Sequence, residues 1–183
     1  MRTSDTDILV VPGLGGSGPD HWQTRWEDRL STARRVRQDD WERPDRKAWV
    51  GRLVDAVAAA TRPVVLVAHS LGVPTVVHAA PLLRPGRTVG AFLVGLPDVE
   101  DPEIEPETLR AFAPLPRDPL PFPSLLVASR TDPFCRFETA EDLSYAWGSA
   151  FVDAGEAGHL NPDSGFGPWP EGLMRFAGFL KKL

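Results

Sequence analysis

The sequence has very little cysteine, and it has no long hydrophobic run. Cys135 is the single cysteine, which excludes an internal disulfide and a cysteine-rich metal site. No apolar stretch approaches the roughly 20 residues that a transmembrane helix needs. The first residues, MRTSDTD, are polar and are not typical of a signal peptide. We therefore expect a cytoplasmic protein without a membrane partner.

Positive charge is also scarce. The chain carries 20 Lys and Arg against 25 Asp and Glu, a formal net charge of −5. Nucleic acids and anionic membranes are bound by clustered Lys and Arg, so neither is an expected partner. No clustered set of metal ligands is present, and we expect neither a metal nor a cofactor. With 183 residues, 42% apolar and 25% charged, residues 1–183 fit one globular domain.

Apolar runs alternate with helical patterns along the chain. Strands are predicted at 7–11, 34–38, 63–68, 88–95, 124–129 and 149–154. Helices are predicted at 19–30, from Pro44-Asp45 to Val57, and at 71–83, 137–147 and 169–183. Regular alternation of strand and helix predicts an α/β fold with a six-stranded parallel sheet in the order 2-1-3-4-5-6 and helices on both faces.

The third strand ends in an unusual way, in the stretch AHSLG at 68–72. A strand that only needs to stop ends in Gly, Asn or Pro, whereas this one ends in a serine between small residues. The pattern small-x-Ser-x-small predicts a nucleophile elbow, with Ala68 in the place of the usual glycine. Ser70 would then stand at the carboxyl edge of the sheet, where open α/β proteins place their sites. The alternative is an ordinary turn with Ser70 as the N-cap of the next helix.

A serine hydroxyl needs a base, and that base needs a carboxylate to fix its tautomer. In this kind of fold the chain order is Ser, acid, His. Asp132 follows the fifth strand and His159 follows the sixth, so both are predicted at the edge that carries Ser70. Asp98, after the fourth strand, is the alternative acid.

Other polar residues are weaker candidates. His69 is expected to point away from the pocket and to pack in the elbow, and His78 and Asp153 are expected to be structural. Cys135 has no adjacent histidine to activate its thiol.

The glycine-rich stretch VPGLGGSGPDHW follows the first strand and supplies the remaining predicted parts of the site. An oxyanion hole needs two backbone donors, and the first is predicted to be the N–H of Leu71, directly after the nucleophile. The second is predicted to be the N–H of Leu14. Gly13 and His21 are predicted to line the pocket, although His21 also fits a packing role at the helix start. The glycine spacing matches neither a dinucleotide-binding loop nor a P-loop.

The segment 97–123 is rich in proline and acidic residues and has little periodicity. It fits an ordered surface connection stiffened by proline. A short cap over a pocket is the alternative, because long loops in compact domains are often functional.

Together these stretches resemble a known family, the small serine hydrolases grouped with retinoblastoma-binding protein nine within the α/β-hydrolase superfamily. The resemblance is carried by VPGLGGSGPDHWQTRWE, VLVAHSLG, LPFPSLLVASRTDPF and AGHLNPDSGFGPWPEG. It implies a single-domain hydrolase without a large lid domain, with Ser70, Asp132 and His159 as its catalytic triad.

The predicted function is hydrolysis of a carboxylic ester or related acyl bond of a small substrate, through an acyl-enzyme on Ser70. A peptidase or thioesterase would use the same triad, and a non-catalytic interaction module on the same fold is the alternative of a different class. The only predicted partner is a small-molecule acyl substrate, and the chain is predicted to be a monomer or a weak homo-oligomer.

Overall fold

The computed structural model describes all residues from Met1 to Leu183 and contains one six-stranded, all-parallel sheet in the order β2-β1-β3-β4-β5-β6. The strands are β1 (Asp7–Val11), β2 (Ala33–Arg35), β3 (Val64–His69), β4 (Thr88–Val94), β5 (Ser124–Ala128) and β6 (Ala150–Asp153). The predicted fold class and strand order are confirmed. The carboxyl ends of all six strands meet at one edge of the sheet.

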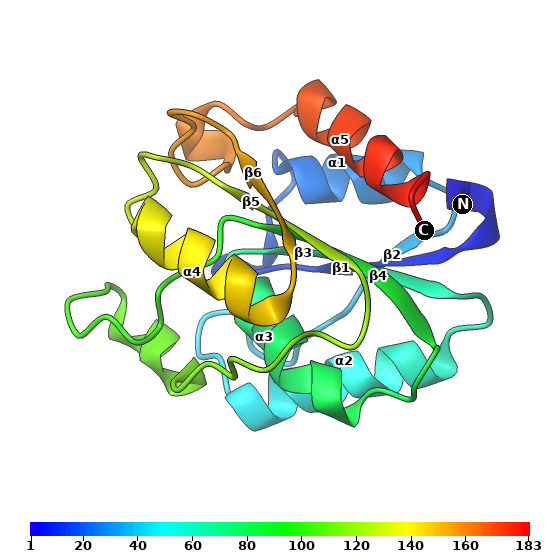
Figure 1. Cartoon of the computed structure of the whole chain (residues 1–183), viewed down its shortest axis with the longest axis horizontal. Coiled ribbons are helices and arrows are strands. Elements are labelled where there is room, and N and C mark those ends of the chain that lie inside the picture. Colours follow the sequence, from blue (N-terminus) through cyan, green and yellow to red (C-terminus); the bar gives the residue numbers. More distant parts are fainter.

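Five α-helices cover the two faces of this sheet: α1 (Trp22–Arg29), α2 (Arg46–Ala59), α3 (Gly72–Ala79), α4 (Phe137–Trp147) and α5 (Pro170–Leu180). Figure 1 shows α1 and α5 on one face and α2, α3 and α4 on the other. Short 3₁₀ helices occupy Thr3–Asp5, Leu14–Gly16, Ala80–Leu82, Glu107–Phe112 and Pro162–Ser164.

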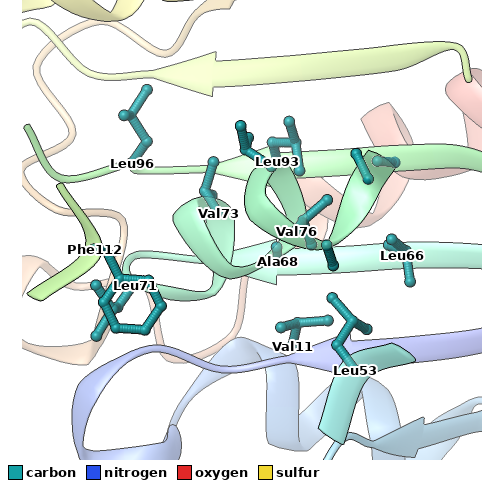
Figure 2. Close-up of a cluster of buried hydrophobic side chains, with 14 of the residues drawn as sticks. Val11, Leu53, Leu66, Ala68, Leu71, Val73, Val76, Leu93, Leu96 and Phe112 are labelled. Atoms are coloured by element: carbon teal, nitrogen blue, oxygen red, sulfur yellow. The ribbon is translucent and has the colours of Figure 1, made fainter. Parts of the chain in front are cut away.

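The central strands are buried on both faces, so the core has two parts. In β3, Val65 and Val67 pack in the cluster that includes α1 and α5, whereas Leu66 and Ala68 pack in the cluster that includes α2, α3 and α4. Figure 2 shows the second cluster around the end of β3. Because successive side chains of a strand point to opposite faces, the continuous apolar run VVLVA serves both clusters.

Three predicted boundaries move, each for a local reason. The strand predicted at 34–38 ends at Arg35 in the structure. It lies at the edge of the sheet, and its last backbone hydrogen bond to β1 runs from Val36 N–H to Val10 O at 2.8 Å. Beyond this point the Gln38 side chain donates to Trp49 O. The first helix begins at Trp22, not at Pro19, because the His21 ring accepts a hydrogen bond from Gln23 N–H and caps the helix. The third helix gives way to a 3₁₀ turn that contains Pro81, which has no N–H to continue an α-helix.

The proline-rich segment 97–123 packs against α2 and α3 as part of the core. Phe112 is fully buried and its ring lies 5.9 Å from that of Trp49. His78 donates to Phe112 O at 2.7 Å, and Arg46 donates to Ala113 O at 2.8 Å. None of the segment's residues lines the cavity at Ser70, so the structure favours an ordered connection over a cap on that cavity. None of the helices combines the length and apolar character needed to cross a bilayer.

Candidate active site

The turn between β3 and α3 holds Ser70 in a backbone conformation that serine rarely adopts. Its φ is +53°, in the left-handed region, which costs about 1–3 kcal/mol for a residue other than glycine. The turn is fixed by a 3.0 Å hydrogen bond from Ser70 N–H to Val94 O. A Cβ on Gly72 would lie 2.1 Å from Val11 O, so only glycine fits two residues after the serine. This geometry is that of a nucleophile elbow.

The structure brings Ser70, His159 and Asp132 together from three separate loops. His159 Nε2 lies 2.9 Å from Ser70 Oγ, and His159 Nδ1 lies 2.9 and 3.0 Å from the two oxygens of Asp132. A carboxylate only accepts, so Nδ1 carries the ring proton. Nε2 is therefore free to accept the hydroxyl proton of Ser70, which is the protonation state that a general base needs.

The acid and the histidine are shielded from water. The side chains of Asp132 and His159 are 4% and 7% exposed. Phe134 stands edge-on against the His159 ring at 4.5 Å between centroids, and its N–H donates to Asp132 Oδ1 at 2.9 Å. With little water to compete, the hydrogen bond between acid and histidine is stronger than it would be at the surface.

The two residues predicted to supply the oxyanion hole are Leu71, directly after the serine, and Leu14, which lines the same cavity. Leu71 N–H has no protein acceptor. Gly13 runs close by: a Cβ there would lie 2.7 Å from Ser70 Cβ and 3.0 Å from Leu71 N. Leu14, the next residue, lines the cavity in front of Ser70. The glycine-rich loop therefore approaches the elbow closely enough for its backbone to meet a ligand there.

The cavity at Ser70 has a volume of about 310 Å³ and is lined mainly by glycine, proline and polar residues. Leu14 is its one aliphatic side chain apart from two prolines, and no lysine or arginine lines it. Asp163 supplies negative charge at its wall, and Asp20, also at the wall, is paired with Arg25 at 3.4 Å. This composition suits a small polar group and disfavours an anion.

His21 both lines this cavity and caps α1, so its two predicted roles occur together. Burial, followed by the influence of His159 and Arg35, lowers the pKa of His21 to about 4. His21 is therefore neutral at physiological pH.

The other polar candidates lie outside the Ser70 site. Asp98 Oδ1 accepts from Glu100 N–H, and the carboxylate that is hydrogen-bonded to His159 is that of Asp132. Burial raises the pKa of the Cys135 thiol, which leaves it protonated and unreactive. Asp153 is paired with Arg130. No group of three or more His, Cys, Asp or Glu side chains is placed to hold a metal ion.

His69 departs from its prediction. His69 is among the residues that line the cavity, and its ring points toward the histidine loop, where Nε2 donates a 2.9 Å hydrogen bond to His159 O. The pattern of the elbow places a side chain before the serine but carries no signal for a bond to a carbonyl 90 residues later. Only the folded chain reveals this contact.

Comparison with known proteins also indicates a hydrolase. A family model described as serine hydrolase matches residues 8–178. A solved protein from Pectobacterium atrosepticum, described as a YdeN-like hydrolase, is 36% identical, with a TM-score of 0.85 over 97% of this chain and 91% of that one. The ydeN gene product from B. subtilis is 20% identical, with a TM-score of 0.80 over 97% of this chain and 99% of that one.

More distant structures share the fold. The esterase domain of a Rhodothermus marinus protein is 18% identical, with a TM-score of 0.64 over 94% of this chain and 85% of that one. A search of curated proteins found no match.

Proposed function

The chain belongs to the serine hydrolase family of the α/β-hydrolase superfamily, and on that basis we propose that it hydrolyses a carboxylic ester of a small polar substrate through an acyl-enzyme on Ser70. The observation that carries the proposal is the continuous hydrogen-bond chain from Ser70 Oγ through His159 to Asp132. A hydroxyl alone is a poor nucleophile, and this chain supplies the base and the group that orients it.

In the proposed reaction, His159 Nε2 takes the proton of Ser70 as Oγ bonds to the substrate's carbonyl carbon. The carbonyl electron pair moves to its oxygen, which the N–H groups of Leu71 and Leu14 stabilise. When the intermediate collapses, the ester C–O bond breaks and the alcohol leaves with the proton held by His159. A water molecule, deprotonated by His159, then attacks the acyl group and releases the acid and Ser70.

The size and charge of the cavity support a small, polar and non-anionic substrate. The cavity of about 310 Å³ has Leu14 as its one aliphatic side chain beside two prolines, which favours a short acyl chain over a long one. Asp163 at the wall disfavours a carboxylate or phosphate, whereas the charge of Asp20 is partly balanced by Arg25 at 3.4 Å. The proposed reaction needs no metal or cofactor. A monomeric or weakly self-associating state and a cytoplasmic location stay predictions, which gel filtration and cell fractionation would check.

The test is a panel of short-chain neutral esters, matched thioesters and amides, assayed with the wild type and with Ser70→Ala. We expect ester turnover by the wild type and a loss of about 10³ to 10⁶ in rate for the variant, because the hydroxyl forms the covalent bond. Preferred turnover of amides or thioesters would move the activity to a peptidase or thioesterase. No turnover of any member, or an active Ser70→Ala variant, would contradict the proposal.

A further inference from the structure

The backbone around His159 is held by side chains from several other elements. On its N-terminal side, Ala157 N–H donates to Ser129 Oγ at 2.9 Å and Gly158 N–H donates to Thr131 Oγ1 at 3.1 Å. His159 N–H donates to Ser164 Oγ at 3.1 Å. On the other side, Leu160 O accepts from Trp22 Nε1 at 2.9 Å. The loop is not a regular element, so these bonds take the place of a helix or strand ladder.

The remaining backbone group of that residue, His159 O, is bound by His69 at 2.9 Å. Because a carbonyl only accepts, His69 Nε2 must carry the proton. His69 is the last residue of β3 and directly precedes Ser70. The elbow that carries the serine therefore also holds the main chain of the histidine that contacts it.

The hydrogen bond between His69 and His159 O is buried and closely packed. The side chain of His69 is buried, with its ring centroid 4.7 Å from that of His21 and 4.9 Å from that of His159. Gly95, at the end of β4, passes close to the bond: a Cβ there would lie 3.2 Å from His159 O and 3.4 Å from His69 Nε2. The ends of β3 and β4 thus meet the histidine loop at this one contact.

We propose that His69 is a positioning residue for the hydrolase reaction, in which its Nε2–H holds His159 at hydrogen-bond distance from Ser70. The inference rests on the proposed function. Ser70 and His69 are neighbours in the chain, at the end of β3. The distance between the nucleophile and the residue that binds the main chain of His159 is therefore fixed by the backbone of one strand end. A shift of about 1 Å in a reacting group can lower a rate by about 100-fold.

His69 also suits this place electrostatically. Burial, then the proximity of His159 and His21, lowers its pKa well below the usual range. It stays neutral while His159 gains a positive charge during the reaction. A lysine or arginine at the same place would donate a hydrogen bond but oppose that charge.

The test compares His69→Gln with His69→Asn, which have the same amide group and differ by one methylene. The Gln amide nitrogen reaches the place of Nε2, and the Asn amide does not. We expect His69→Gln to keep kcat within about threefold of the wild type, and His69→Asn to lower kcat about 10- to 100-fold with little change in KM. The rate of Ser70 labelling by a fluorophosphonate should follow kcat. Urea unfolding of each variant measures the change in stability separately.

Three results would overturn the positioning role: equal loss in both variants, full activity in both, or a loss that appears in KM alone. If His69→Asn does not fold, His69→Leu and His69→Phe replace it as variants without the donor, and His69→Gln must still exceed any folded one of them in kcat. If His69→Asn, His69→Leu and His69→Phe all fail to fold, His69→Gln alone decides: wild-type stability combined with a large loss of kcat in that variant would contradict the inference. A wild type without esterase activity or Ser70 labelling would instead remove the proposed function itself.

Discussion

At the scale of single residues, the site depends on where each proton sits. The carboxylate of Asp132 fixes the proton of His159 on Nδ1, and the bare Nε2 faces Ser70. The order of Ser70, Asp132 and His159 along the chain is readable from the sequence because each follows a strand at the same sheet edge. The histidine tautomers and the hydrogen bond from His69 cannot be read from the sequence, because they depend on side-chain directions that the pattern of apolar residues does not specify.

Asp132→Asn tests this residue-level arrangement. The amide keeps the shape of the carboxylate but favours the wrong histidine tautomer, so we expect kcat to fall by about 10³ to 10⁴. Asp98→Asn is the matched control, because Asp98 also follows a strand end but its carboxylate accepts a hydrogen bond only from Glu100 N–H. It should leave kcat within about twofold. Steady-state ester hydrolysis measures kcat for the two variants. A larger loss of kcat in Asp98→Asn than in Asp132→Asn would identify Asp98, after β4, as the catalytic acid.

At the scale of elements, the elbow and the glycine-rich loop depend on close backbone approach. The sequence predicts that β1 ends at Pro12-Gly13. It does not predict which residue binds the glycine-rich loop that follows. The loop is held by Arg35 of β2, whose guanidinium donates to Ser17 O at 3.1 Å and pairs with Glu27 at 3.0 Å. The arginine-rich stretch RRVRQ is a weak strand pattern because Val36 is its only side chain in the hydrophobic core, while Arg35 binds the loop.

Gly72→Ala tests the contact between the elbow and β1. The new Cβ would lie 2.1 Å from Val11 O, a backbone atom that cannot move without bending the central sheet. We expect a loss of unfolding free energy of at least about 2 kcal/mol, together with lost activity. Gly51→Ala is the matched control: it lies in α2 with nothing within 4 Å of the added Cβ, and it should stabilise by about 0.5–1 kcal/mol. Urea denaturation measures both, and equal stability of the two variants would contradict the close approach.

At the scale of the whole molecule, two histidines are buried in neutral form inside the carboxyl edge of the sheet. The pKa of His21 is lowered from 6.5 to about 4, and that of His69 is lowered well below its usual range, with burial as the main cause of both. Both histidines take up protons near 6.5 in the unfolded chain but not in the folded one. Their contribution to stability is therefore present above pH 6.5 and is lost as the pH falls from there toward 4.

We therefore expect the unfolding free energy to decrease steadily between pH 6.5 and pH 4, by on the order of 3 kcal/mol for His21 alone, since one pKa unit is about 1.36 kcal/mol. Urea denaturation at a series of pH values measures this slope. His21→Gln should reduce the slope of unfolding free energy against pH by the amount that corresponds to about one bound proton. A stability that is constant or rises over this range would show that the histidines are charged in the folded protein.

The central claim is that Ser70 forms the covalent bond and that His159 activates it. The most direct measurement is labelling of the purified chain with a fluorophosphonate, followed by mass spectrometry of its peptides. The account predicts one adduct per chain, on Ser70, at a rate reduced by several orders of magnitude in His159→Ala and unchanged in His78→Ala. An adduct on another residue, or labelling of Ser70 that is as fast without His159, would contradict it.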